Sequence, residues 1–173
     1  MLQTSDSSVS GHSSDKGFTL LEILVVVVIF GLLLGGAVAN YRRLNERKIV
    51  EGAAKQVEQA LRDAQKRASA GVKPSSVECD DPETLNSYVI TMSGTGYQIQ
   101  ANCSGGSPSP SSYTLPQGTT IGSASAPTVT FNVLTLAATA ATVCVQNTSG
   151  TLIFKIDVTD GGAISYQGQQ ICP

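Results

Sequence analysis

The pattern of hydrophobic and polar residues begins with a polar segment and a long apolar run. Residues 1–14 are polar and have no apolar period, so they predict no ordered structure. The stretch "DKGFTLLEILVVVVIFGLLLGGAVANYRR" then contains an apolar run of 22 residues, from Phe18 to Ala39. A helix of that length crosses a bilayer at about 1.5 Å per residue. One carboxylate, Glu22, interrupts the run at its fifth position.

The apolar residues after the run recur at three- and four-residue spacing, which predicts an amphipathic helix. This stripe consists of Val50, Ala53, Ala54, Val57, Ala60, Leu61, Ala64 and Ala68. Charged residues on the other face form favourable i,i+4 pairs, namely Glu51–Lys55 and Glu58–Arg62. Gly71 is a helix stop and Pro74 is the first proline, so we expect one helix of about fifty residues, from Phe18 to roughly Ala70.

The last hundred residues or so predict short strands joined by turns rich in Gly, Ser and Pro. The expected strands are 87–92, 97–101, 128–133, 141–146, 151–158 and 163–167. The turn "SGTG" joins the first two, and "SGGSPSPSS" at 104–112 is expected to be a loop. Because the connections are short, the sheet should be antiparallel. The sequence therefore predicts an α+β fold, with the long N-terminal α-helix packed on an antiparallel β-sheet.

Charge is distributed unevenly along the chain, although the total is only −2. Residues 40–73 contain nine Lys or Arg and four Asp or Glu, a net charge of +5, whereas residues 74–173 contain one and six, a net charge of −5. No charged side chain occurs between Thr84 and Phe154. This composition suits an exported β domain and is a poor surface for phosphate or nucleic acid.

The four cysteines indicate an oxidising compartment. Cys79, Cys103, Cys144 and Cys172 contain no CxxC pair, which argues against a zinc site. An even number beyond a membrane segment favours two disulfides over four buried free thiols. Of the three pairings, Cys79–Cys103 and Cys144–Cys172 are favoured because each closes a local loop.

The sequence offers no candidate for catalysis, a cofactor or a metal. The only histidine, His12, precedes the apolar run, so no His-based triad can form, and no GxxxxGK[ST] phosphate loop is present. Carboxylates gather at 78–83 and at Asp157 with Asp160, but neither group has the spacing of a calcium loop, and ordinary turn chemistry is favoured. We therefore expect no enzyme.

Glu22 needs an explanation, because a carboxylate in hydrocarbon is costly and needs a named partner. The nearest basic residues are Lys16, before the run, and Arg42, at its other end. Cutting the chain between Gly17 and Phe18 would create an α-amino group at the start of the helix. The Glu22 carboxylate of one copy could then neutralise the amine of another, which predicts side-by-side assembly.

The stretch "KGFTLLEILVVVVIFGLLL" resembles the N-terminal signature of type IV prepilins and type II secretion pseudopilins. Gly17, Phe18 and Glu22 match that signature residue by residue. The resemblance implies cleavage after Gly17 by a prepilin peptidase, N-methylation of Phe18, and a role for Glu22 in filament assembly. It implies no catalytic residue, cofactor or metal. The partners that it implies are other pilin or pseudopilin subunits, the inner-membrane assembly machinery and membrane lipid.

The resemblance also implies four segments. They are a cleaved leader (1–17), a transmembrane and filament-core helix (18–39), an amphipathic helix (40–72) and a disulfide-bearing antiparallel β domain (73–173). The protein would span the bacterial inner membrane once, with its C-terminal domain in the periplasm or outside the cell, and would then enter a filament. The C-terminal half resembles H-type minor pseudopilins and FimT/FimU-type minor pilins, and the absence of a proline near the end of the apolar run also favours a minor subunit.

Three alternatives remain. The segment "GGAVAN" at 35–40 resembles a signal-peptide cleavage site, although the apolar core is long for a signal peptide. The chain could also be a membrane-anchored exported binding domain that does not polymerise. Four basic residues after the run could contact DNA, as in a competence minor pilin, or anionic lipid, but a solvated helix face is favoured. These residues, Arg42, Arg43, Arg47 and Lys48, also oppose the positive-inside rule.

Overall fold

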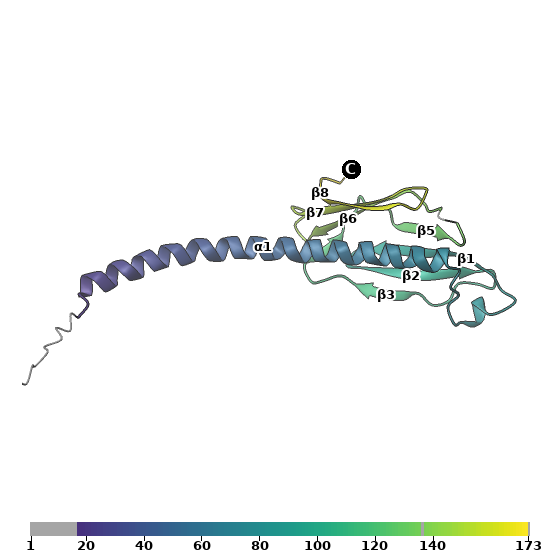
Figure 1. Ribbon diagram of the computed structural model, residues 1–173, viewed down its shortest axis with the longest axis horizontal. Helices are drawn as coiled ribbons and strands as arrows, with labels where there is room; N and C mark the ends of the chain where they lie inside the picture. Colours follow the sequence, from purple (N-terminus) through teal and green to yellow (C-terminus); the bar gives the residue numbers. More distant parts are fainter. Residues whose placement is uncertain (1–16, 136, 173) are drawn as a thin grey trace, which may run out of the picture. The chain divides into compact units, whose positions relative to one another are not determined.

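The computed structural model describes residues 17–135 and 137–172, and the side chains of 35–39 lie outside that description (Figure 1). The predicted leader, 1–17, therefore lies outside the described residues except for Gly17. The chain divides into two compact units, 1–41 and 42–173. The first unit contains the beginning of helix α1. The second contains the rest of α1 and all the strands.

Helix α1 spans Leu20–Ser69 as a single helix of 50 residues, as the sequence predicted. It ends at the expected glycine, because Gly71 adopts a positive φ of 62°. The N–H of Gly71 donates to the carbonyl of Ala68 (3.1 Å), and the N–H of Val72 donates to the carbonyl of Arg67 (3.0 Å). These two bonds form a Schellman cap, which satisfies helix carbonyls that would otherwise have no partner.

The strands form two antiparallel sheets of four strands each, where the sequence had predicted one sheet. The first has the order β3-β2-β1-β5, and its strands are β1 (Leu85–Ser93), β2 (Gly96–Cys103), β3 (Ser111–Thr114) and β5 (Thr128–Asn132). The second has the order β4-β6-β7-β8, and its strands are β4 (Thr119–Ile121), β6 (Ala141–Asn147), β7 (Ile153–Val158) and β8 (Ile164–Gln169). The α+β class and the antiparallel pairing are confirmed.

Three short elements were not predicted. The 3-10 helix η1 spans Val77–Cys79, and β3 and β4 are edge strands of four and three residues. All four side chains of β3 are exposed, so this strand has no alternation of apolar and polar residues that a pattern search could detect. The predicted loop at 104–112 is therefore wrong at its end, because Ser111 already pairs with Ile99 of β2.

The core of the second unit lies between α1 and the two sheets (Figure 1). The eight residues of the predicted stripe are all buried. They share one cluster with alternate residues of the strands, including Tyr88, Ile90, Phe131, Val145 and Ile156. In β1 and β2 the buried and exposed positions alternate, as expected for a sheet with one covered face.

Two disulfides hold the second unit, Cys79–Cys103 and Cys144–Cys172, and these are the two local loops favoured from the sequence. Their Cα–Cα distances are 5.4 and 6.3 Å, within the usual range. Cys144 is fully buried but does not belong to the core cluster that contains its neighbours Val143 and Val145. The second disulfide therefore lies on the far face of its sheet. It fixes the segment after β8 to β6, across the intervening strand β7.

Candidate functional site

The signature residues lie where helix α1 begins. Gly17, Phe18 and Thr19 are outside regular secondary structure and exposed, and the helix starts at Leu20. The N–H of Glu22 donates to Thr19 Oγ1 (3.2 Å), and the N–H of Ile23 donates to the Thr19 carbonyl (3.3 Å). Thr19 is thus the N-cap, and the spacing Thr-x-x-Glu is that of a capping box. Sequence reasoning missed this role of Thr19, although the spacing alone could have revealed it.

Glu22 also has an electrostatic effect at the start of the helix. Its carboxylate lies in the first turn of α1, where the helix dipole favours negative charge. Its side chain is exposed, and among the described residues it takes part in no ion pair. An α-amino group created at Phe18 would lie at the same positive end of the dipole, so it would gain from a nearby carboxylate.

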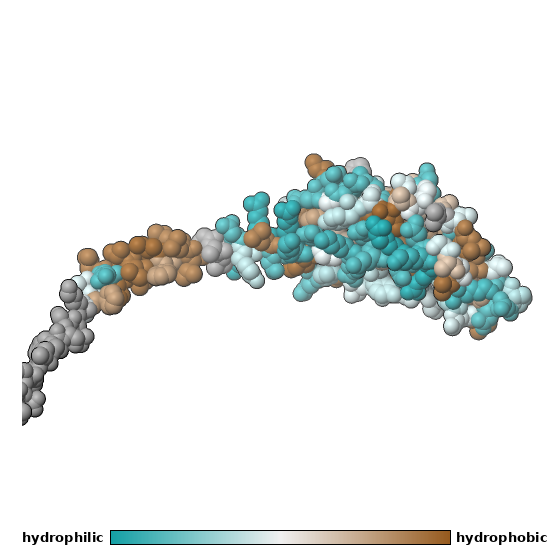
Figure 2. Space-filling view, in the orientation of Figure 1, coloured by the Kyte–Doolittle hydropathy of each residue, from teal (hydrophilic) through white to brown (hydrophobic). Residues whose placement is uncertain are grey.

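The helix that follows Glu22 is apolar on every side. Figure 2 shows apolar residues along this first part of α1. The large apolar residues from Phe18 to Leu34 are all exposed, so none has a packing partner in the first unit. Among the helical residues that the structure describes, no stretch is long and apolar enough for a membrane span. The predicted membrane helix, 18–39, includes the side chains outside the description and stays a prediction.

The predicted basic group lies on α1 at the start of the second unit. Arg42, Arg43, Arg47 and Lys48 are all exposed. Lys48 Nζ lies 3.4 Å from the carboxylate of Glu51, which also pairs with Lys55 at 3.0 Å. The bond from Lys55 and the charges of both lysines lower the pKa of Glu51. Within the described part of the chain, the three arginines form no ion pair.

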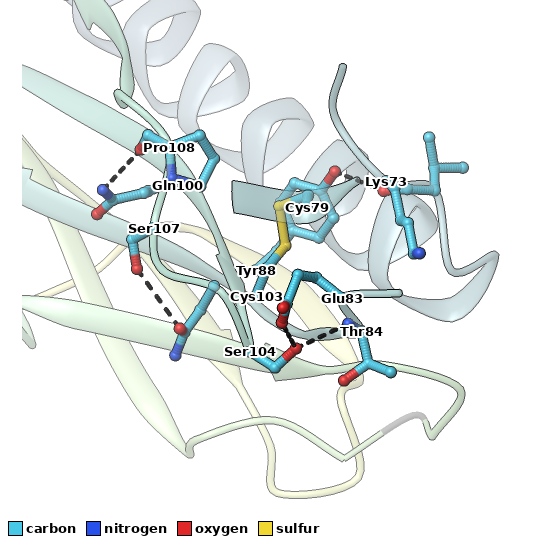
Figure 3. The surroundings of a disulfide bond; sticks show 12 residues. Lys73, Cys79, Glu83, Thr84, Tyr88, Gln100, Cys103, Ser104, Ser107 and Pro108 are labelled. Carbon is cyan, nitrogen blue, oxygen red and sulfur yellow. Dashed lines mark hydrogen bonds between the residues drawn. A yellow bond between two sulfur atoms is a disulfide. The ribbon is translucent and has the colours of Figure 1, made fainter. Parts of the chain in front are cut away.

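The Cys79–Cys103 disulfide fixes the turn that leaves the helix (Figure 3). Cys79 is fully buried, and the hydroxyl of Tyr88 donates to the carbonyl of Val72 (2.7 Å). Lys73 pairs with Asp81 at 2.7 Å, and this hydrogen bond holds the pKa of Asp81 below its usual value. The Ser104 hydroxyl donates to the Glu83 carboxylate and accepts from the N–H of Thr84 (2.8 Å).

The other carboxylates have ordinary roles in turns and strands. Asp157 accepts from the hydroxyl of Thr142 (2.9 Å) and pairs with Lys155 at 3.0 Å. Asp160 accepts from the N–H of Ala140 (3.2 Å). In the described ranges, no three His, Cys, Asp or Glu side chains gather as a metal site would need. His12 lies outside the described residues.

Comparison with known proteins gives one sequence match and one structural match. The family described as the prokaryotic N-terminal methylation motif matches residues 12–38. No curated protein sequence matches the chain significantly. The fold is similar to that of the minor pseudopilin EpsH from the type 2 secretion system of Vibrio cholerae, with a TM-score of 0.52. The likeness covers 69% of this chain and 97% of the other at 10% identity, so it concerns the fold alone.

The N-terminal motif and the similar fold occur in one chain and share helix α1. The motif occupies the start of a long helix, and the same helix packs on antiparallel sheets in a fold similar to that of a pseudopilin. The chain carries a prokaryotic N-terminal methylation motif, and its fold is similar to that of a minor pseudopilin.

Proposed function

We propose that this chain is a minor pilin or pseudopilin subunit that is cut between Gly17 and Phe18 and assembles into, or primes, a filament. The observation that carries the proposal is the position of the motif. The cleavage site lies in exposed, non-helical backbone directly before a capped helix whose first part is apolar on all sides. A peptidase needs an accessible, extended peptide bond, and a filament core needs an unpartnered apolar helix.

The apolar run would serve both in the membrane and in the filament. Its 22 residues would first hold the chain in the bacterial inner membrane, with the second unit in the periplasm. The same surface would then pack against other subunits as the inner-membrane machinery assembles them. The two disulfides agree with an oxidising compartment beyond the membrane. The partners are the prepilin peptidase, membrane lipid, the assembly machinery and other pilin or pseudopilin subunits.

The choice of a minor subunit rests on two further observations. The apolar run contains no proline near its end, so it lacks the residue that kinks a helix. The fold is similar to that of a minor pseudopilin. The work of such a subunit is assembly and not catalysis.

Cleavage can be measured as the intact mass of the full chain co-expressed with a prepilin peptidase. We expect the loss of residues 1–17 and the gain of one methyl group on the new amine of Phe18. A full-length mass would leave only a membrane anchor. A cut near Ala39 would identify a signal peptide and remove the filament helix, which would refute the proposal.

Glu22 can be tested with two variants that separate its local effect at the helix start from the contact with an amine that we propose. Glu22→Gln keeps the spacing and polarity of a capping box but removes the charge, whereas Glu22→Ala removes both. We expect both variants to be cut and methylated normally, and both to be lost from sheared filaments.

Recovery of Glu22→Gln in filaments at the wild-type level would show that helix capping suffices and that no charge pair forms between subunits. Thr19→Ala is the matched control. It removes the N-cap oxygen but keeps the carboxylate, so we expect it to enter filaments more readily than either Glu22 variant.

A further inference from the structure

The first two turns of α1 in the second unit carry no buried side chain, although Glu46 accepts a hydrogen bond from Asn147 at the end of β6 (2.7 Å). Every residue from 42 to 49 is exposed, and burial begins at Val50. Leu44 is 60% exposed. Spacings of three and four residues place Arg43, Leu44 and Arg47 on one side of the helix. We call these three residues the basic face.

The arginines of the basic face are unusual in two respects. They form no ion pair within the described residues, although the four salt bridges along α1 neutralise charges on the next turns. In the proposed orientation they also lie on the exported side of the membrane, where the positive-inside rule disfavours them. An exposed apolar side chain beside two arginines that form no ion pair among the described residues is a surface that fits an apolar residue flanked by acids.

The same unit displays a surface of that kind after the helix. Val77 in η1 is 85% exposed, and Glu78 and Asp80 beside it are also exposed. Neither carboxylate forms an ion pair among the described residues, unlike Asp81, which binds Lys73. We call Val77, Glu78 and Asp80 the acidic turn.

The acidic turn is held in place by a disulfide. Cys79, in its middle, is fully buried and bonded to Cys103, so the disulfide anchors the turn to the end of β2 (Figure 3). Because no charged side chain occurs from Thr84 to Phe154, the charges nearest to it in sequence are those of Lys73, Asp81 and Glu83. The net charges of +5 for residues 40–73 and −5 for residues 74–173 make two copies complementary when arranged head to tail.

We propose that the acidic turn of one copy docks on the basic face of a second copy, with Val77 against Leu44 and with Glu78 and Asp80 beside Arg43 and Arg47. This inference rests on the proposed function, and it adds a specific contact to it. The contact is heterologous, because each copy contributes two different surfaces. Repetition of such a contact gives an open filament when the rotation between copies does not close, and it does not give a two-fold symmetric dimer.

Photo-crosslinking tests the contact in the full chain. One tagged copy carries the photoreactive residue benzoylphenylalanine in place of Val77, and a second copy with another tag is co-expressed in the same membrane. We expect a covalent dimer in which position 77 is joined to residues 43–47 of the second copy. The matched control places the probe at Leu134, which is 79% exposed and lies outside the acidic turn, and it should give no such product.

Charge exchange then tests the electrostatic part. Arg43→Glu with Arg47→Glu in the receiving copy should reduce the cross-linked fraction by about fivefold or more, since like charges replace opposite ones. Glu78→Arg with Asp80→Arg in the probe copy should restore it. Raising the salt from 0.1 M to 1 M should weaken the wild-type product, because screening shortens to about 3 Å.

Several results would overturn the inference. They are a cross-link between two acidic turns, an equal product from position 134, no product at all, and a failure of the charge exchange to restore it. A salt-dependent DNA shift that needs Arg43 and Arg47, without a cross-link, would assign the basic face to nucleic acid instead. Normal cleavage and filament entry without the cross-link would leave the proposed function intact and remove only this contact.

Discussion

Asn147 is a buried polar residue that joins the turn after β6 to helix α1. It is 2% exposed, and its side-chain nitrogen donates to the carboxylate of Glu46 on α1 (2.7 Å) and to the hydroxyls of Ser149 and Thr151. Its side-chain oxygen accepts from the N–H groups of Thr151 and Leu152. One buried amide therefore shapes the turn between β6 and β7 and fixes it to the helix.

Substitution of Asn147 should be costly because several partners lose their bonds together. We expect Asn147→Ala to lower the free energy of unfolding by about 2–3 kcal/mol, measured by urea denaturation monitored by circular dichroism. Asn147→Asp should also destabilise the unit at pH 7, because it sets a second carboxylate against Glu46. A Ser149→Ala control removes only one of the bonds, and an equal loss there would contradict the central role of Asn147.

Among the elements, the long helix was the most predictable, and the edges of the sheets were the least. The stripe from Val50 to Ala68 could be read from spacing because every third or fourth residue meets the same core. Gly71 could be read as the stop because only a positive φ closes the Schellman cap. Strand β4 has three residues and β3 has none buried, so neither carries a periodic signal.

The division into two sheets depends on pairing between residues distant in sequence, and local patterns do not encode it. The candidate site was predictable because, as in the helix, its residues lie close together in the sequence. Gly17, Phe18 and Glu22 form a contiguous motif, whereas Asn147 and Glu46 meet only in the fold. The basic face and the acidic turn could be seen as charge runs, but their exposure and lack of described partners came from the structure.

The disulfide between Cys144 and Cys172 stabilises an element and not the core. Because it lies on the far face of its sheet, the variant Cys144→Ala with Cys172→Ala should keep the core cluster and the secondary structure. It should nevertheless lose about 3–4 kcal/mol of stability, since the bridge closes a loop with a sequence separation of 28. Thermal denaturation with and without a reducing agent measures this. A variant as stable as the wild type would show that the bridge adds nothing to the strand pairing.

At the scale of the whole molecule, three tyrosines that are buried or partly buried should make stability depend on alkaline pH. The rings of these tyrosines face the core cluster shared by α1 and both sheets. Burial raises the pKa of Tyr88, Tyr97 and Tyr166 above the ordinary value of 10.0. In each case the loss of hydration of the phenolate is the main cause.

The sign of the resulting pH dependence follows from these directions. Below pH 10 the folded and unfolded chains both keep the phenol protons, so the tyrosines add no pH dependence. Above pH 10 the unfolded chain loses protons that the folded chain retains, and the free energy of unfolding should fall as pH rises. Urea denaturation from pH 8 to pH 11 measures the slope. Tyr88→Phe should cost about 1 kcal/mol at pH 8, because its bond to Val72 is lost, yet it should flatten the alkaline slope. An unchanged slope in that variant would mean that the buried phenol of Tyr88 does not resist ionisation in the folded chain.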